Sequence, residues 1–324
     1  RAVRDDFLCG YYGKAGPYIG KYIEALTGAL GRSGSGLDIY EPPTNHADDF
    51  LSAADVGAFN AIFDKAEAAA AGDPAAVRRV RTARLPLIYA MLEIGKNDMF
   101  GPRGFYSEEN NRFTPKPEMI GLIDAFAGRC REGGVRSLNE SGLTPEDYTA
   151  GVRRFIDVQV EGNAAFRRPV QADPPPSSKY ARGDLSVLTN GVRGAVDFKV
   201  HWLGWEGRDF ALILDLGKAV QAREISLSTL SDQRSWILHP ETVACSVSAD
   251  GAAYREIGAS PPGGDHRGEE PVRVYRWPGP IEGGESPAAV RFIRFSVEGT
   301  RRLPDWHPSA GGLSWVFVDE IIVR

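Results

Sequence analysis

The sequence predicts an α + β multidomain protein in which an all-α helical bundle precedes an antiparallel β-sandwich. The first observation is that apolar residues recur three and four positions apart through residues 1–166, which is helical spacing. The second is that short runs of alternating apolar and polar residues, separated by Gly, Pro and Asp, fill residues 183–324. Between them lies the Pro-rich segment 167–182, whose composition is typical of an extended spacer. We therefore predict two domains joined by this linker, and the length of 324 residues also favours two.

The predicted helices of the first domain begin at residues suited to helix N-termini. Pro17 suits a first turn, where the backbone N–H is unpaired in any case. Ser52, Asp73 and Thr144 are good N-cap residues. Pro86 should kink the helix that follows Asp73, and no strand is expected in this domain. The expected helices span 3–12, 17–30, 52–71, 74–92, 118–131 and 145–162.

The predicted strands of the second domain end in the most apolar run of the chain, Trp315 to Val323. A terminal strand of this kind must be paired within a sheet, because an unpaired apolar strand would aggregate. Asp250-Gly251 is a hairpin signal. Seven or eight strands at this spacing indicate a sandwich. The expected strands span 210–216, 224–230, 242–248, 254–257, 272–277, 290–297 and 315–323.

The composition excludes several classes of protein. The net charge of −5 and the charged fraction of 25% give no basic footprint for nucleic acid or for an anionic membrane. No apolar run approaches the roughly 20 residues that a membrane span needs. The three cysteines, Cys9, Cys130 and Cys245, are widely separated and odd in number, so neither a disulfide framework nor a metal cluster is indicated. The chain begins without Met or a signal peptide, and we expect Arg1 not to be the natural start.

Four ordered blocks of the second half resemble a known family. They are Leu188 to Gly194, Trp202 to Gly217, Ser235 to Gly251, and Pro304 to Ile321 with its Trp306-His307 and Gly311-Gly312 pairs. Together they resemble the discoidin-type (coagulation factor V/VIII type C, galactose-binding-like) jelly roll, in the variant appended to bacterial exo-β-hexosaminidases. The resemblance implies an antiparallel β-sandwich that contacts carbohydrate.

A second resemblance covers part of the helical domain. The segment Phe7 to Ile19 is similar to the start of the helical region that follows the catalytic (β/α)-barrel in a glycoside hydrolase family long catalogued as a domain of unknown function. That family includes gut-bacterial endo-β-N-acetylglucosaminidases. Ala83 to Tyr89 and Gly134 to Glu140 fit the same region less specifically. The resemblance implies that the catalytic acids lie on a barrel that precedes Arg1, in an exported bacterial enzyme that is periplasmic, cell-surface or extracellular.

Tryptophans supply the main candidate site. Five of the six lie in connections or at strand edges of the β half. Sugars present flat C–H faces, so a sugar site needs exposed aromatic rings beside planar polar groups. The alternative is that these rings plug the ends of the sandwich, which we favour for Trp236 and Trp315. If the loops converge, the carbohydrate-binding candidates are Trp202, Trp205, Glu206, Arg208, Asp209, Trp236, His239, Trp306 and His307.

The discoidin resemblance also implies a structural calcium ion between the opening turn and the last strand. The matching positions are Asn190 and Glu320, and Asn190 stands where the family usually has Asp. Asp319 and Glu320 should alternate between the two faces of the strand, so at most one is expected to point at the turn. The alternative is a buried acid that accepts hydrogen bonds from the turn.

The sequence offers no recognisable catalytic site. Glycoside hydrolysis needs two carboxylates about 5 to 10 Å apart, and the adjacent pairs 48–49, 108–109 and 269–270 are better explained as solvated loop charges. Cys9 is expected to be a buried thiol. The Gly-rich stretch 258–268 lacks a P-loop Lys and a following helix. Whether this chain alone is an enzyme is left open.

These observations favour the accessory C-terminal region of a secreted glycoside hydrolase that acts on N-acetylhexosamine-containing glycans. Its expected partners are a glycan or polysaccharide and the upstream catalytic barrel of the same gene product. Two alternatives stay open. The chain could be a free-standing carbohydrate-binding protein, or a protein–protein adhesion or assembly module.

Overall fold

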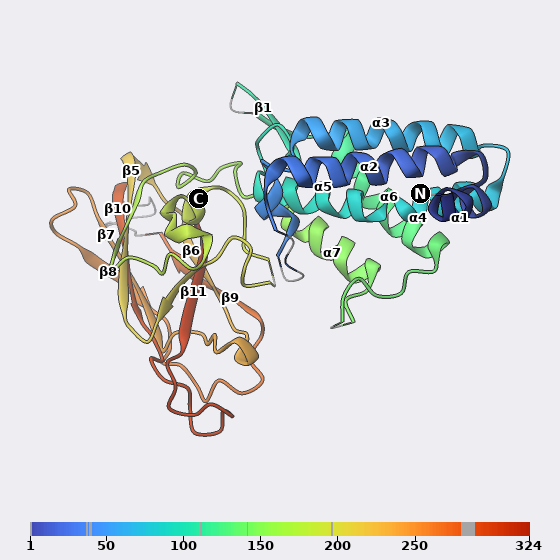
Figure 1. Ribbon diagram of the computed structural model, residues 1–324. Coiled ribbons are helices and arrows are strands. Elements are labelled where there is room, and N and C mark those ends of the chain that lie inside the picture. Colours follow the sequence, from blue (N-terminus) through green and yellow to red (C-terminus); the bar gives the residue numbers. More distant parts are fainter. Residues whose placement is uncertain are drawn as a thin grey trace. The chain divides into compact units, whose positions relative to one another are not determined.

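A computed structural model describes residues 2–36, 38, 41–110, 112–140, 142–195, 197–279 and 289–324. The chain divides into two compact units, Arg1–Ile156 and Asp157–Arg324. The first is largely helical and the second is built from strands (Figure 1). The division lies N-terminal to the predicted boundary at residue 166. Among the described residues, no helix combines the length and apolarity that crossing a bilayer would require.

The helical unit contains seven α-helices within its described residues. Ser52 and Thr144 accept hydrogen bonds from the backbone N–H three residues on, and Asp73 accepts from Ala75 and Ala76, as their cap positions predict. Helix α2 packs against α3, and α6 packs against α4, α5 and α7. The helices are α1 (Ala2–Tyr12), α2 (Gly16–Ser33), α3 (Ala53–Ala70), α4 (Pro74–Ala83), α5 (Leu85–Asn97), α6 (Pro117–Gly133) and α7 (Pro145–Phe155).

Several expectations for the helical unit are wrong in detail. The helix expected over 74–92 is two helices, because Pro86 lies in the first turn of α5 rather than in a helix interior. The unit also contains a short antiparallel hairpin of β1 (Tyr106–Glu109) and β2 (Arg112–Pro115), although no strand was expected. Cys9 is exposed, since α1 buries only Leu8 of its apolar residues.

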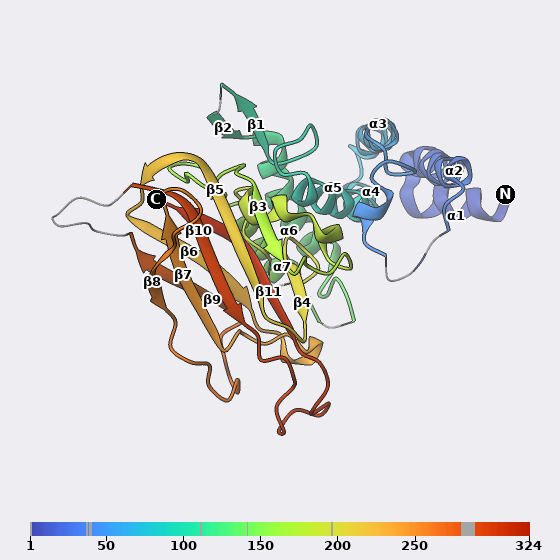
Figure 2. The same cartoon turned by 90° about the vertical axis from the view of Figure 1, so that its left-hand side faces the viewer.

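The second unit is a sandwich of two antiparallel sheets (Figure 2). One has the strand order β3-β5-β10-β7-β8 and the other β4-β11-β6-β9. All seven predicted strands are present; six agree within two residues at each end, whereas the strand expected over 210–216 runs on to Gln221. The strands are β3 (Val170–Asp173), β4 (Leu203–Glu206), β5 (Phe210–Gln221), β6 (Glu224–Leu230), β7 (Thr242–Ser248), β8 (Arg255–Ala259), β9 (Val272–Pro278), β10 (Ala289–Glu298) and β11 (Trp315–Val323).

The core between the sheets follows from the period-two pattern of the strands. In β5 the alternate residues Phe210, Leu212, Leu214 and Leu216 are buried, and they pack with Phe295 of β10. Strand β11 differs, because all of its residues are buried. One face of β11 joins this core and the other packs in an aromatic cluster with Trp202 and partly buried Tyr180 and Phe198.

The predicted linker is partly a member of the sheet. Strand β3 lies within it and pairs with β5, from Val170 opposite Leu214 to Asp173 opposite Ala211. The Pro-rich composition hid this short edge strand, which precedes the prolines.

The preceding segment 157–166 is fastened to β11 by Asn163, whose side chain is buried. Its Oδ1 accepts hydrogen bonds from the backbone N–H groups of Ala165 and Val323, both at 3.0 Å. Its Nδ2 donates to Gln159 O at 3.0 Å and to Glu320 Oε1 at 3.3 Å. This segment therefore belongs with the β unit.

Replacing Asn163 should destabilise the β unit selectively. Asn163→Ala leaves two buried N–H groups without an acceptor, so we expect a loss of about 2 to 4 kcal/mol in the free energy of unfolding. Because all six tryptophans lie between residues 202 and 315, tryptophan fluorescence in a denaturant titration reports on this unit alone. Gln171→Ala, at an exposed position of β3, is the control and should change stability by less than about 0.5 kcal/mol. Equal effects of the two variants would contradict the fastening role.

Candidate functional site

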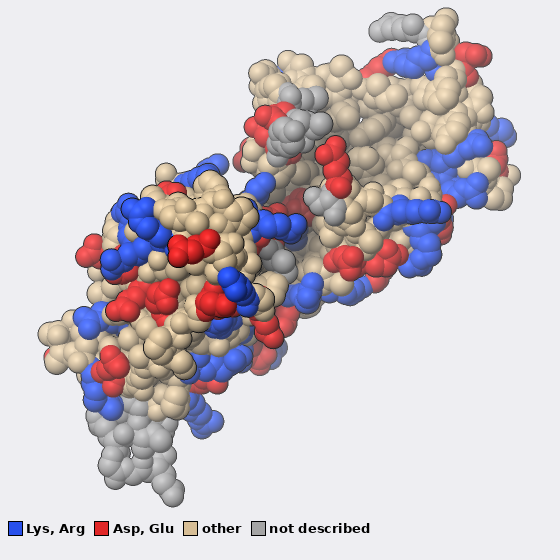
Figure 3. All heavy atoms as spheres, turned by 90° about the horizontal axis from the view of Figure 1, so that it is seen from below, with Lys and Arg blue, Asp and Glu red and all other residues tan. Residues whose placement is uncertain are grey.

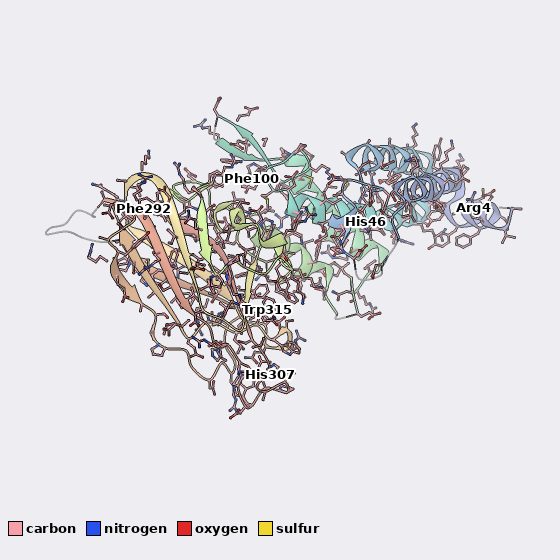
Figure 4. All side chains as sticks on the ribbon, turned by 60° about the vertical axis from the view of Figure 1, so that its left-hand side comes forward. Arg4, His46, Phe100, Phe292, His307 and Trp315 are labelled. Carbon is pink, nitrogen blue, oxygen red and sulfur yellow. The ribbon has the colours of Figure 1, made fainter. Side chains whose placement is uncertain are left out.

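Four connections meet at one end of the sandwich, which we call the loop end. They are 207–209, 231–241, 260–271 and 299–314. Gly207 N donates to Ser314 O at 2.8 Å, which joins the first connection to the last. Trp306 Nε1 donates to Asp265 O at 2.7 Å, which joins the third to the last. Figures 1 and 2 show these loops below the strands, and Figure 4 places His307 there.

Trp236 presents its ring to solvent at the loop end, with 46% of its surface exposed. Its backbone is fixed: the N–H donates to Gln233 O at 3.1 Å and the carbonyl accepts from Trp315 N at 2.8 Å. Its φ of 65° is left-handed, a conformation uncommon for a residue with a side chain. The expectation that Trp236 plugs the sandwich is therefore wrong, although Trp315 is buried as expected.

Trp306 is the second aromatic ring of the loop end and is half-buried. Besides its hydrogen bond to Asp265, its ring lies 5.6 Å from the guanidinium carbon of Arg267, measured to the ring centroid. A cation–π contact of this kind orients the ring. Trp236 and Trp306 are therefore the two candidate tryptophans with ring surface at the loop end.

Trp202 and Trp205 lie in the interior, each only 1% exposed. Trp202 Nε1 donates to Ala195 O at 2.6 Å, and Trp205 Nε1 donates to Pro174 O at 2.8 Å. Trp205 also stacks on Phe210, with ring centroids 3.9 Å apart. Both rings support the sandwich, as the alternative proposed, and neither reaches the surface as a sugar platform.

His239 and His307 are buried and connect loops to one another. His239 Nε2 lies 2.9 Å from Glu270 O and its Nδ1 lies 2.7 Å from Thr229 Oγ1. His307 Nε2 lies 2.8 Å from Gln233 O, and its Nδ1 accepts from Ser309 N at 3.0 Å. The carbonyl partners require a proton on Nε2 of each ring, and Nδ1 of His307 carries none because it accepts from a backbone N–H. Burial lowers the pKa of His239, which favours the neutral form of that ring.

The charged candidates Arg208 and Asp209 lie on the first connection, and Glu206 precedes it as the last residue of β4. Asp209 accepts hydrogen bonds from Arg301 Nε at 3.0 Å and from Gly299 N at 3.1 Å. The hydrogen bond from Arg301 lowers the pKa of this carboxyl below its ordinary value. Glu206 and Arg208 are exposed, and Arg208 Nε donates to Glu206 O at 3.3 Å. Asp209 thus fastens two loops, whereas the other two present polar groups to solvent.

A pocket of about 490 Å³ opens beside the loop end, against connection 260–271 and strand β9. We call it the side pocket. The sequence analysis missed its residues, because the Gly-rich stretch 258–268 was tested only for phosphate binding. The signal that could have located it is His266 between nearby charged residues of both signs.

Both acids of β11 point at the opening turn, contrary to expectation. Glu320 Oε1 accepts from Gly191 N at 3.0 Å, and Asp319 Oδ2 accepts from Gly194 N at 2.8 Å. The reason is a bulge: Val318 pairs with Thr229 and Ile321 with Leu227, so the two acids together oppose one residue of β6. Such a bulge interrupts the alternation that the sequence analysis assumed.

These residues do not fit the calcium site that the resemblance implied. The turn presents N–H donors to the acids, whereas calcium needs carbonyl and carboxylate oxygens. Asn190 Oδ1 accepts from Val192 N at 2.9 Å, and its Nδ2 lies 3.1 Å from His201 Nδ1. Among the described residues, no group of three or more His, Cys, Asp or Glu is placed to hold a metal. Glu320 accepts a hydrogen bond from the turn, which is the arrangement that the alternative to calcium described.

Burial and a nearby arginine act in opposite directions on the charge of this acid pair. Asp319 Oδ1 and Glu320 Oε2 are buried without a hydrogen-bond partner among the described residues. Burial raises the pKa of Asp319 to about 6, and burial followed by the charge of Asp319 raises that of Glu320 well above its ordinary value. The positive charge of Arg193 opposes both shifts.

The comparisons with known proteins concern the β unit. No protein-family model matches the sequence, and no curated protein does. Among solved structures, the chain is similar to CBM32-1 of a family 31 glycoside hydrolase from Clostridium perfringens (13% identity, 52% of this chain and 98% of that chain, TM-score 0.32). It is similar to chitosan-binding module 1 of a chitosanase/glucanase from Paenibacillus sp. IK-5 (10% identity, 51% and 99%, TM-score 0.33). It is also similar to the lectin domain of lectinolysin complexed with Lewis B antigen (10% identity, 51% and 96%, TM-score 0.32).

Calcium should leave the stability of the β unit unchanged. A specific site occupied at one hundred times its Kd would raise the free energy of unfolding by about 2.7 kcal/mol. We expect no such gain, because the turn offers donors rather than oxygen ligands. Thermal unfolding followed by tryptophan fluorescence in 5 mM EDTA, and then with excess CaCl₂ or MgCl₂, measures it. If calcium but not magnesium raised the midpoint of thermal unfolding, and EDTA reversed the change, a calcium ion would replace the hydrogen bonds between the two acids and the turn.

Proposed function

We propose that the β unit binds carbohydrate at its loop end, as an accessory part of an exported bacterial glycoside hydrolase that acts on N-acetylhexosamine-containing glycans. The observation that supports this most is the exposed ring of Trp236 at the end of the sandwich where four connections meet, an end that also carries half-buried Trp306. An aromatic face held by a fixed backbone is what the C–H face of a pyranose ring stacks on. The proposed ligand class follows from the sequence resemblances.

The charges at the surface favour a binding role for an uncharged partner. Over the β unit, basic and acidic residues are interspersed on the face that Figure 3 shows. In two of the adjacent acid pairs considered for catalysis, one member is held in an ion pair: Asp49 lies 3.0 Å from His46, and Glu269 lies 2.7 Å from Arg273. We therefore place the catalytic chemistry of the parent enzyme on its barrel rather than on this chain.

The helical unit has one surface that favours contact with another protein domain. Val3, Phe7 and Tyr11, spaced four residues apart on α1, are 86%, 61% and 43% exposed. The rings of Phe7 and Tyr11 stack with centroids 5.4 Å apart. An apolar stripe of this kind is typical of an interface. We propose that the upstream catalytic barrel covers it, and we name the stripe the α1 face.

The barrel can be tested by the intact mass of the protein from its native source. A species larger than 35.2 kDa by a few hundred residues is expected, because a barrel would precede this chain. A species of 35.2 kDa would leave the α1 face to an unrelated partner and would favour an assembly module.

Removing the exposed ring should weaken carbohydrate binding. We expect Trp236→Ala to weaken binding of N-acetylglucosamine oligomers about tenfold or more, since one aromatic contact is worth on the order of 1 kcal/mol beyond the area it buries. Isothermal titration calorimetry with the full chain measures this. Phe7→Ala, which removes an exposed ring of the helical unit, is the matched control and should leave affinity unchanged.

Two results would count against the proposal. Unchanged affinity in Trp236→Ala would move the site away from the loop end. Indifference of the wild-type chain to these oligomers, and to galactose- and N-acetylgalactosamine-containing glycans, would favour the assembly role over carbohydrate binding.

A further inference from the structure

The side pocket has a volume of about 490 Å³, which is within the range of small-ligand sites. Its walls include Pro262, Asp265, His266, Glu269, Arg273 and Tyr275. Charged and hydrogen-bonding groups of Asp265, His266, Glu269 and Arg273 thus lie beside apolar wall surface, a mixture that suits a sugar, which presents hydroxyls as well as C–H faces.

His266 is held in the pocket wall by several contacts at once. It is 3% exposed, and its ring nitrogens lie 3.2 Å from Glu269 Oε2 and 3.4 Å from Glu241 Oε1. Nε2 also lies 3.2 Å from Thr300 Oγ1. Its φ of 62° is left-handed, which is unfavourable for a residue with a Cβ. Such a conformation persists only where the surroundings enforce it, so this wall is rigid.

Glu269 and Arg273 form an ion pair in the pocket wall. Arg273 Nη2 donates to Glu269 Oε1 at 2.7 Å, and the Arg273 side chain stays 37% exposed. Burial alone would raise the pKa of Glu269, but hydrogen bonds from Arg273 and His266 bring it below its ordinary value. The pair therefore offers an ionised carboxylate and a guanidinium side by side, which can accept from and donate to neighbouring hydroxyls.

The charges of the pocket are balanced, which bears on the ligand. Two acids, Asp265 and Glu269, and two arginines, Arg267 and Arg273, line it and form the ion pairs Asp265–Arg267 and Glu269–Arg273. A ligand with a net charge would be repelled by the charges of one sign as it was attracted by those of the other. The pocket is thus matched to a neutral ligand.

The side pocket and the loop end share one segment of chain. Connection 260–271 forms the pocket wall, and its Asp265 carbonyl accepts the Trp306 indole N–H. Arg267 of the same segment lies over the Trp306 ring. A ligand on Trp306 would therefore border the pocket.

We propose that the side pocket is a second subsite, which takes a neutral sugar unit of an oligosaccharide whose neighbouring unit stacks at the loop end. The β unit would then bind chains of two or more sugar units in preference to a single sugar. This inference rests on the proposed function, because it assigns the length and charge of the glycan bound at that site.

Calorimetry with N-acetylglucosamine and its β-1,4-linked tetramer tests the second subsite on the full chain. We expect the tetramer to bind at least about tenfold more tightly than the monosaccharide. Arg273→Ala should remove this difference and leave monosaccharide affinity unchanged, whereas Trp236→Ala should weaken both. Arg276→Ala is the matched control, because this arginine lies on the same strand, exposed, and outside the pocket wall.

Glu269→Gln is the second pocket variant, in case Arg273→Ala perturbs folding, and both are checked by tryptophan fluorescence and circular dichroism. Equal affinity for monosaccharide and tetramer, or full tetramer affinity in a folded pocket variant, would overturn the second subsite while the loop-end site stands. If the wild-type chain binds neither N-acetylglucosamine nor its tetramer, both this inference and the choice of N-acetylglucosamine as ligand are overturned. Binding of galactose- or N-acetylgalactosamine-containing glycans would then show that the loop end still binds carbohydrate.

Discussion

The complete burial of β11 is the constraint on which the rest of the β unit depends. This strand is central in its sheet, between β4 and β6, and every residue from Trp315 to Val323 is buried. Two of those residues are acids, which cost several kcal/mol in an interior unless they are hydrogen-bonded or neutralised. The bulge at Asp319 and Glu320 directs both toward the N–H groups of the opening turn. Asn163 supplies further hydrogen bonds to the buried polar groups of β11, because it bonds both Glu320 and the backbone N–H of Val323.

The loop end depends on the other end of the same strand. Trp315 N donates to Trp236 O, so the strand that fills the core also fixes the backbone from which the Trp236 ring projects. His239 and His307 then join the adjoining loops through their ring nitrogens. A binding surface held in this way loses little conformational entropy when a ligand arrives, which favours affinity from few contacts.

The sequence predicted the strands well because period-two alternation is a direct consequence of one buried and one exposed strand face. The prediction was wrong where a strand was too short or too irregular to show one buried and one exposed face. Strand β3 is a four-residue edge strand next to prolines, with too few residues to display a period. The bulge in β11 reverses the expected facing of one acid, and no residue type marks it. Cys9 was placed inside because α1 looks amphipathic, yet its apolar Val3 and Phe7 are exposed.

The candidate site was predicted in composition but only partly in geometry. Tryptophan is suited both to a buried core and to an exposed surface on which a sugar stacks. Residue type alone therefore could not distinguish Trp202 and Trp205 from Trp236. In the structure the two kinds of tryptophan differ in which of their groups is hydrogen-bonded to the rest of the fold, the indole N–H or the backbone. Trp202 and Trp205 donate their indole N–H to backbone carbonyls inside the fold, which is what a buried indole requires. Trp236 instead uses its backbone for the fold, and its left-handed conformation turns the ring outward.

The side pocket was not predicted for a similar reason: the sequence gives the residue types but not their arrangement in space. Its polar groups come from one connection and one strand, and their pairing across space, not their order along the chain, gives the pocket its neutral charge. Exposed surface charges would contribute little to binding because water and salt screen them. Here Glu269 and His266 are largely buried, so their hydrogen bonds act in a less polar medium and hold Arg273, whose side chain stays partly exposed, in the pocket wall. Under the proposed second subsite, these balanced charges would favour an uncharged sugar unit, and the neighbouring aromatic rings would provide the apolar contact.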